Sequence, residues 1–146
     1  MRISVGSDHA GFELKEHVAE ALRAAGHDVI DVGTDSEEST HYPLFAEPAS
    51  RMVAEGEVHR GVLVCGSGVG VSIVANKVDG VRAVNAHDVG EASMARKHND
   101  VNVLTLSGRR LTPEVADAIV ETFLDTEFEG GRHEQRVALI SDVEKR

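Results

Sequence analysis

The segment Cys65-Gly66-Ser67-Gly68-Val69-Gly70 combines a nucleophilic thiol with alternating glycines. Glycines at this spacing let successive backbone N–H groups point at one anion, and a helix N-terminus behind them adds a positive dipole end. The segment is neither a dinucleotide-binding fingerprint, because Val71 replaces its third glycine, nor a P-loop, because no Gly-Lys-Ser/Thr follows. The loop alone therefore indicates either an anion site or a plain strand-to-helix turn.

Cys65 is the only cysteine of the chain and ends the apolar run 61–65. A lone cysteine at a strand end is commonly a small buried hydrophobic residue. A helix N-terminus and a row of amides beside it, however, favour the thiolate. Because the same amides can hold a developing oxyanion, the segment predicts a base next to an anion stabiliser.

Two further groups of side chains could take part in such chemistry. Arg132 and Arg136 lie one turn apart on a predicted helix, where they suit bidentate contact with a phosphate or simply form a solvated face with nearby glutamates. His98 ends another predicted helix, whose C-terminus favours imidazolium. His98 could thus donate a proton near neutral pH, or act only as a cap.

Other chemistries find little support in the sequence. The eight histidines show neither HExxH nor paired Cys/His spacing, so no metal site is predicted. Ser67, His9 and Asp8 could form a nucleophilic triad, but Gly-Ser-Gly lacks the G-x-S-x-G elbow. A hydrolase is therefore disfavoured.

Composition limits the class of protein. A length of 146 residues, with 41% hydrophobic and 27% charged residues, is typical of one globular domain, residues 1–146. The net charge of −10 and an aromatic content of 3% argue against nucleic-acid binding, although one small phosphate could bind to a local Arg/His cluster. No signal peptide or membrane-spanning run is evident, and a single cysteine suits a reducing compartment. A cytoplasmic protein without membrane or nucleic-acid partners is expected.

Short β-branched runs alternate with helical patterns along the chain. This alternation predicts an α/β fold with a parallel sheet covered on both faces. Asp88 with Glu91 resembles a capping box, and Thr112-Pro113-Glu114 resembles a helix start. Strands are predicted at 3–5, 29–32, 61–65, 81–84 and 101–106. Helices are predicted at about 10–25, 43–55 and 132–144. Three more helices are predicted to begin after the loop 66–70, at 88 and at 112.

Ligands of open parallel sheets bind beyond the carboxyl ends of the strands. The segments 6–9, 65–70 and 85–88 follow three predicted strands and are expected to meet there.

With these motifs in their order and spacing, the chain resembles the type B ribose-5-phosphate isomerase family, which includes the galactose-6-phosphate isomerase subunits. The resemblance extends over almost the whole chain. It rests on Gly6-Ser7-Asp8-His9-Ala10-Gly11, Val32-Gly33-Thr34, Tyr42-Pro43, Cys65-Gly66-Ser67-Gly68-Val69-Gly70, Ala75-Asn76-Lys77, His98-Asn99-Asp100-Val101-Asn102-Val103-Leu104 and Glu129-Gly130-Gly131-Arg132-His133.

The resemblance implies a three-layer α/β/α sandwich with a five-stranded parallel sheet, Rossmann-like or flavodoxin-like. It also implies a homodimer or a dimer of dimers with active sites shared between subunits, where the helix at about 132–144 reaches the partner. The implied reaction is an aldose–ketose isomerisation of a sugar phosphate through an enediolate, without a cofactor.

The resemblance further implies site residues. Cys65 matches the base and His98 the acid of ring opening, while the Ser67 hydroxyl could support the Cys65 thiolate or the negative oxygen of the enediolate. The glutamate used by one branch of the family is Val71 here, so this chain follows the cysteine branch. Substrate-binding positions are matched by Asp8, His9, Tyr42, Gly66, Ser67, Gly68, Val69, Gly70, Asn99, Arg109, Arg132 and Arg136.

Two departures from the family pattern concern the substrate. His41 stands where an acidic residue is common, and Asn85 stands where a strand usually stays apolar; both could border the far end of the sugar. Ribose 5-phosphate is therefore only the default, beside a tetrose phosphate such as erythrulose 4-phosphate or a six-carbon aldose 6-phosphate. A non-catalytic phosphate- or nucleotide-binding module and a non-catalytic partner subunit are the alternatives of other classes.

Overall fold

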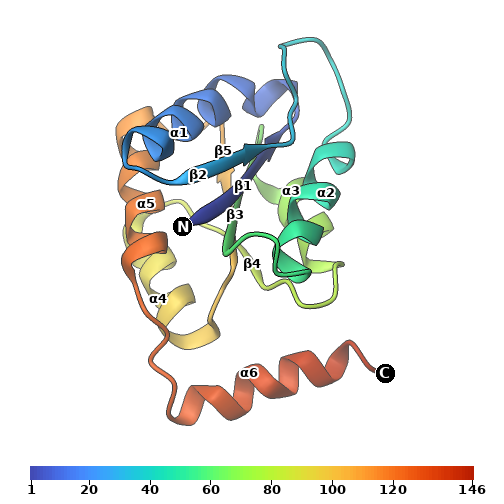
Figure 1. Cartoon of the computed structure of the whole chain (residues 1–146), viewed down its shortest axis with the longest axis vertical. Helices are drawn as coiled ribbons and strands as arrows, with labels where there is room; N and C mark the ends of the chain where they lie inside the picture. Colours follow the sequence, from blue (N-terminus) through green and yellow to red (C-terminus); the bar gives the residue numbers. More distant parts are fainter.

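The computed structural model describes all 146 residues and has one five-stranded parallel sheet at its centre. The spatial order of the strands is β2-β1-β3-β5-β4 (Figure 1). β2 therefore lies on one side of β1, and the later strands β3, β5 and β4 lie on the other side. The strands are β1 (Arg2–Ser7), β2 (Asp28–Asp31), β3 (Arg60–Cys65), β4 (Ala83–Asn85) and β5 (Val103–Ser107).

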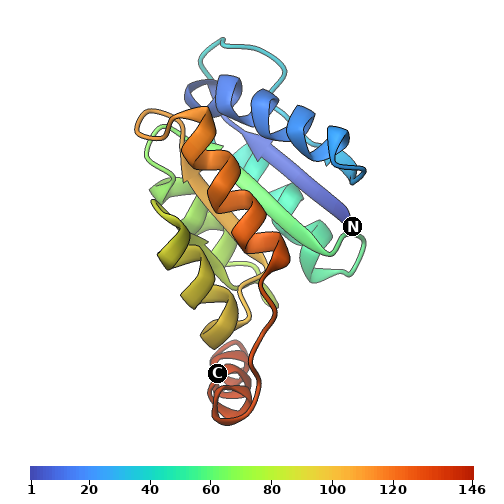
Figure 2. The ribbon, with the colours of Figure 1, turned by 90° about the vertical axis from the view of Figure 1, so that its left-hand side faces the viewer.

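Helices cover both faces of the sheet, which confirms the expected three-layer sandwich. α1, α4 and α5 pack on one face (Figure 2), around a core of 19 buried residues that includes Val62, Val64 and Leu106. α2 and α3 pack on the other face, over 11 buried residues that include Leu63 and Cys65. The helices are η1 (His9–Gly11), α1 (Phe12–Ala24), α2 (Pro43–Ala54), α3 (Val69–Asn76), α4 (Val89–Asn99), α5 (Pro113–Asp125) and α6 (Arg132–Val143).

The last two strands begin later than their apolar runs predict. Val81 and Val101 are buried, but their backbone N–H groups bond to Val78 and Ala95, which belong to the preceding turn and helix. Both residues fill the core before the chain reaches the sheet. The apolar runs include these buried residues, so the strands predicted from the runs begin two residues before β4 and β5 do.

Helix starts follow the expected capping chemistry, with one change. The Asp88 carboxylate accepts a hydrogen bond from the Glu91 N–H (2.8 Å), as predicted. The Glu91 carboxylate, in turn, accepts from the N–H of His87, one residue earlier than in a capping box (3.0 Å). Thr112 Oγ1 accepts from Val115 N–H (3.3 Å), which confirms the predicted start of α5.

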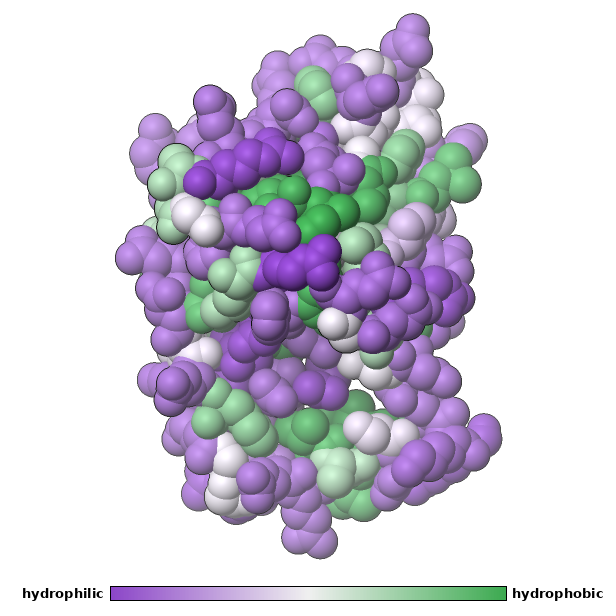
Figure 3. Space-filling view, viewed as in Figure 1, coloured by the Kyte–Doolittle hydropathy of each residue, from purple (hydrophilic) through white to green (hydrophobic).

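Helix α6 stands apart from the sandwich. Gly130 and Gly131 both have positive φ and redirect the chain after α5, so α6 runs across the end of the domain (Figure 1). Figure 3 shows hydrophobic side chains along the hollow between α6 and the rest of the domain, which Val81, Ile140 and Val143 line. No helix of the chain combines the length and apolar character that crossing a membrane would need.

Candidate active site

A pocket of about 420 Å³ opens at the carboxyl ends of β1, β3 and β5. The chain leaves β1 toward α1 on one face and leaves β3 toward α3 on the other, so the two loops diverge and leave a crevice between them. Nine predicted site residues meet here, together with Ala10 and Ile73, which sequence analysis did not single out. The nine are Asp8, His9, Tyr42, Cys65, Gly66, Ser67, Val69, Gly70 and Arg109.

Cys65 is the last residue of β3, and only 5% of its surface is exposed. Its Sγ accepts a hydrogen bond from the N–H of Gly68 (3.2 Å), a contact that stabilises a thiolate more than a thiol. Gly68 has φ +78°, a conformation that favours glycine, and helix α3 begins directly after it. Cys65 is thus buried, as expected of a lone cysteine at a strand end, and it also lines the pocket.

The backbone of the glycine loop presents free donors. The N–H groups of Ser67, Gly70 and Val71 make no hydrogen bond within the chain. The N–H of Val69 instead bonds to Ser67 Oγ (3.1 Å), so this hydroxyl also caps α3. Because these amides lie at the first turn of a helix and close to Cys65, they can bind an oxyanion that forms next to the thiolate.

Two glycines admit large side chains close to the loop. A Cβ on Gly66 would lie 3.1 Å from Cζ of Arg109, and a Cβ on Gly70 would lie 2.6 Å from the ring of Tyr42. The absence of both Cβ atoms therefore brings a guanidinium and a phenol against the loop.

His9 and Asp8 follow β1 and have defined partners. His9 Nδ1 accepts a hydrogen bond from Thr40 N–H (3.1 Å), which leaves the proton of the neutral ring on Nε2 as a donor. Asp8 Oδ1 accepts from Gly11 N–H (3.0 Å) and so caps η1. Asp8 thus fixes the turn that carries His9.

Gly68 lies in the same loop beside Cys65, whereas the last four predicted residues, His98, Asn99, Arg132 and Arg136, lie at the opposite edge of the sheet. His98 is in the last turn of α4, which leads into the start of β5, whereas Cys65 pairs with Ser107 at the end of β5. The two edges are separated by the four residue steps from Val103 to Ser107 in β5, which corresponds to about 13 Å. Asn99, Arg132 and Arg136 are exposed at this same end and do not line the Cys65 pocket.

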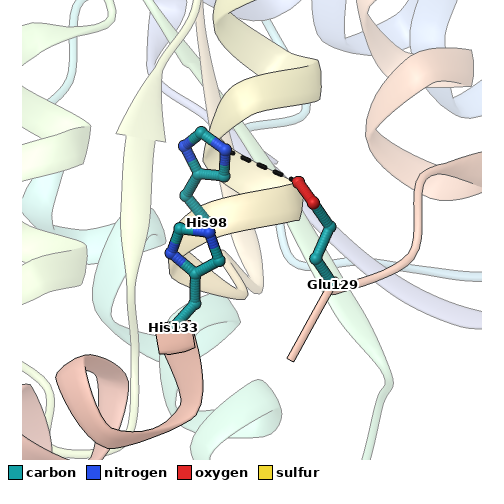
Figure 4. Close-up of side chains that lie close together, drawn as sticks. All are labelled: His98, Glu129 and His133. Carbon is teal, nitrogen blue, oxygen red and sulfur yellow. Dashed lines mark ion pairs between the residues drawn. The ribbon is translucent and has the colours of Figure 1, made fainter. Parts of the chain in front are cut away.

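His98 belongs to a cluster with Glu129 and His133 (Figure 4). The rings of His98 and His133 are stacked, with centroids 4.4 Å apart and planes 14° apart. His98 Nε2 lies 3.5 Å from Glu129 Oε1. One possible ligand atom from each of the three side chains lies within 4.8 Å of the others, so the expected absence of a metal site stays a prediction.

His133 was not predicted as a site residue from the sequence, although it directly follows Arg132 in the motif Glu129-Gly130-Gly131-Arg132-His133. Burial, followed by the positive charges of His98 and Arg132, lowers the pKa of His133. His133 therefore binds a proton less readily than an ordinary histidine, and it faces a His98 that is paired with a carboxylate.

The two residues that depart from the family pattern are not in the pocket lining. His41 is exposed next to Tyr42. Asn85 lies beneath the glycine loop, where its side-chain Nδ2 donates to Ser67 O (3.2 Å). Asn85 therefore does not border the pocket as expected, but supports the loop from below.

Comparison with known proteins identifies the family of the chain. The family described as Ribose/Galactose Isomerase matches residues 3–140. Ribose-5-phosphate isomerase B of Escherichia coli is 46% identical over 99% of this chain and 97% of its own length. D-erythrulose-4-phosphate isomerase of Pectobacterium atrosepticum is 39% identical over 99% of this chain and 95% of its own.

A solved structure has the same fold over almost the whole length of both chains. Clostridium thermocellum ribose-5-phosphate isomerase B is 46% identical, with a TM-score of 0.98 over 99% of this chain and 98% of that chain. Together with the family match over residues 3–140, this likeness means that the chain belongs to the ribose/galactose isomerase family.

Proposed function

We propose that the chain interconverts ribose 5-phosphate and ribulose 5-phosphate through an enediolate, with Cys65 as the base. The observation that carries the proposal is the position of the Cys65 thiol, which is hydrogen-bonded to Gly68 N–H beside three unpaired amides. A base and an anion site side by side are what proton transfer next to a carbonyl requires.

In the proposed mechanism, His98 assists opening of the sugar ring and so exposes the carbonyl. Cys65 thiolate removes the proton from the adjacent carbon, and the loop amides stabilise the negative oxygen that results. The Ser67 hydroxyl is available to support the thiolate or the negative oxygen. The proton then returns to the neighbouring carbon. No cofactor is needed, because the carbonyl itself acidifies the C–H bond.

This mechanism requires a second subunit, because Cys65 and the acid and phosphate-binding residues are too far apart within one chain. His98, Arg132 and Arg136 lie at the opposite edge of the sheet from Cys65, so we propose a homodimer or a dimer of dimers in which each subunit completes the partner's site. Exposed apolar side chains occur at both ends and support such pairing. They are Leu44, Val69 and Ile73 beside the pocket and Leu139, Ile140 and Val143 on α6.

The exposed guanidiniums of Arg132 and Arg136 are proposed to hold the phosphate, with Arg109 and His9 as helpers. Arg136→Ala is expected to raise KM about 10- to 100-fold with little change in kcat, because it removes a charged hydrogen bond made equally in ground and transition states. Steady-state kinetics with Arg146→Ala, an exposed arginine outside the cluster, provide the matched control. An unchanged KM for Arg136→Ala would count against this role.

The length of the sugar is tested by comparing kcat/KM for four-, five- and six-carbon aldose phosphates. Ribose 5-phosphate is expected to give the highest value. The tetrose phosphate is the second candidate, because a relative 39% identical to this chain bears the name D-erythrulose-4-phosphate isomerase. A higher kcat/KM for a four- or six-carbon substrate would replace ribose as the substrate while retaining the chemistry.

The alternative of a non-catalytic phosphate-binding module is tested in deuterated water. An isomerase exchanges the proton next to the carbonyl with solvent, whereas a module that only binds does not. Incorporation of deuterium into the sugar phosphate is expected, and its absence with all three sugars would contradict the proposal. We also propose that the enzyme works in the cytoplasm, where reducing conditions preserve the thiol.

A further inference from the structure

The glycine loop is held from below by three side chains of the sheet. Ser107 Oγ donates to Gly66 O (2.7 Å), Asn85 Nδ2 to Ser67 O (3.2 Å) and Thr105 Oγ1 to Gly68 O (2.9 Å). Thr105 and Ser107 are completely buried, and Asn85 is the strand neighbour of Thr105. Three consecutive carbonyls are therefore bound on the side of the loop that faces away from the pocket.

A trans peptide directs its carbonyl and its N–H in opposite directions. The carbonyl of Ser67 and the N–H of Gly68 belong to one such peptide. Asn85 binds this peptide at its oxygen, and Cys65 Sγ binds it at its nitrogen. The orientation of the donor that Cys65 receives therefore depends on the contact that Asn85 makes at the other end of the same plane.

The packing of Asn85 against Gly68 strengthens this link. A Cβ on Gly68 would lie 2.2 Å from Asn85 Oδ1, so the side chain rests directly on the α carbon of Gly68. Asn85 Oδ1 itself is buried and has no hydrogen-bond partner. A buried acceptor without a partner is unfavourable for folding, so stability alone does not account for an asparagine at this position.

We propose that Asn85 is a positioning residue, which fixes the Ser67–Gly68 peptide so that its N–H stabilises the thiolate of Cys65. The inference rests on the proposed role of Cys65 as the base and identifies what prepares that base. Asn85 does not line the pocket, and it acts only through the peptide.

The test is the reactivity of Cys65 itself, measured by alkylation with iodoacetamide across a range of pH. Cys65 is the only thiol of the chain, so every alkylation event reports on it. Asn85→Val removes the donor and is short enough to avoid Gly68. We expect alkylation at pH 7 to slow about 3- to 10-fold, the factor that one neutral hydrogen bond contributes, and the pH profile to move upward.

Three further readouts separate positioning from a structural role. For Asn85→Val, kcat should fall by a factor similar to that of alkylation, KM should change little, and Tm should be no lower than in the wild type.

Asn85→Asp keeps the size of the side chain but turns a carboxylate oxygen toward Ser67 O, so its alkylation should slow at least as much. Asn76→Val is the matched control, because the Asn76 side chain likewise bonds to the backbone, at Ala83, but lies outside the Cys65 pocket.

Wild-type alkylation profiles in both Asn85 variants would overturn the inference, as would an equal slowing in Asn76→Val. The alkylation rate is measured without substrate, so it tests the positioning of Cys65 separately from the proposed reaction. Slower alkylation in a chain without isomerase activity would retain the positioning role and reject the function. Full isomerase activity with unaltered alkylation would do the reverse.

Discussion

Replacement of Cys65 by alanine is expected to lower kcat by about 10²–10⁴-fold, because the variant lacks the proposed base that removes the proton from carbon. The buried thiol is small, and alanine leaves the neighbouring Leu63 and Val71 of the same core in place. Binding of the sugar phosphate should therefore persist while turnover is lost. Isomerisation by purified protein, followed together with Tm, measures both effects.

Two other variants distinguish the loss of the base from the loss of packing. Cys65→Ser preserves the size of the side chain but not its ease of ionisation, so its activity should be as low as that of the alanine variant. Ser67→Ala removes only a supporting hydroxyl and should retain much more activity. Turnover near the wild-type level in Cys65→Ala would eliminate the thiolate from the mechanism.

Mixing two inactive variants is expected to restore activity if each site is shared between subunits. Cys65→Ala damages one half of the site, and His98→Asn damages the other. When the two chains are refolded together in equal amounts, a site is intact only if one chain supplies Cys65 and the partner supplies His98. Random pairing in a symmetric oligomer then restores about one quarter of wild-type activity, whether the assembly is a dimer or a dimer of dimers.

Activity that stays at the level of the two separate variants would contradict the shared site. Refolded wild type carried through the same procedure sets the scale. Size-exclusion chromatography of the mixture verifies that the oligomers have formed again. The approximate distance of 13 Å between the two edges of the sheet is the geometric reason to expect complementation.

The parts of the site that sequence analysis predicted best are those made by local chain geometry. Cys65 and the loop after it form a continuous segment, and alternating glycines already indicate a turn into a helix. The fold was predictable for a similar reason, because strands that alternate with helices allow few arrangements. The burial of Val81 and Val101 ahead of their strands was the main local exception.

Contacts between distant segments were harder to predict. Thr105 and Ser107 look like polar residues on a strand surface, but both are buried under the glycine loop. Asn85 was expected next to the sugar because it interrupts an apolar strand, whereas it supports Ser67. The separation of His98 from Cys65 follows from the parallel sheet, since a helix ends where the next strand begins, but residue types alone do not reveal it.

A chain that carries complementary half-sites at its two ends can satisfy them in either of two ways. A head-to-tail array leaves one half-site open at each end and grows into a filament unless its rotation closes a ring, whereas a two-fold pair closes on itself. The direction that Gly130 and Gly131 impose on α6 therefore bears on more than catalysis. If the sites are shared as proposed, this direction also bears on whether completing an active site terminates the assembly.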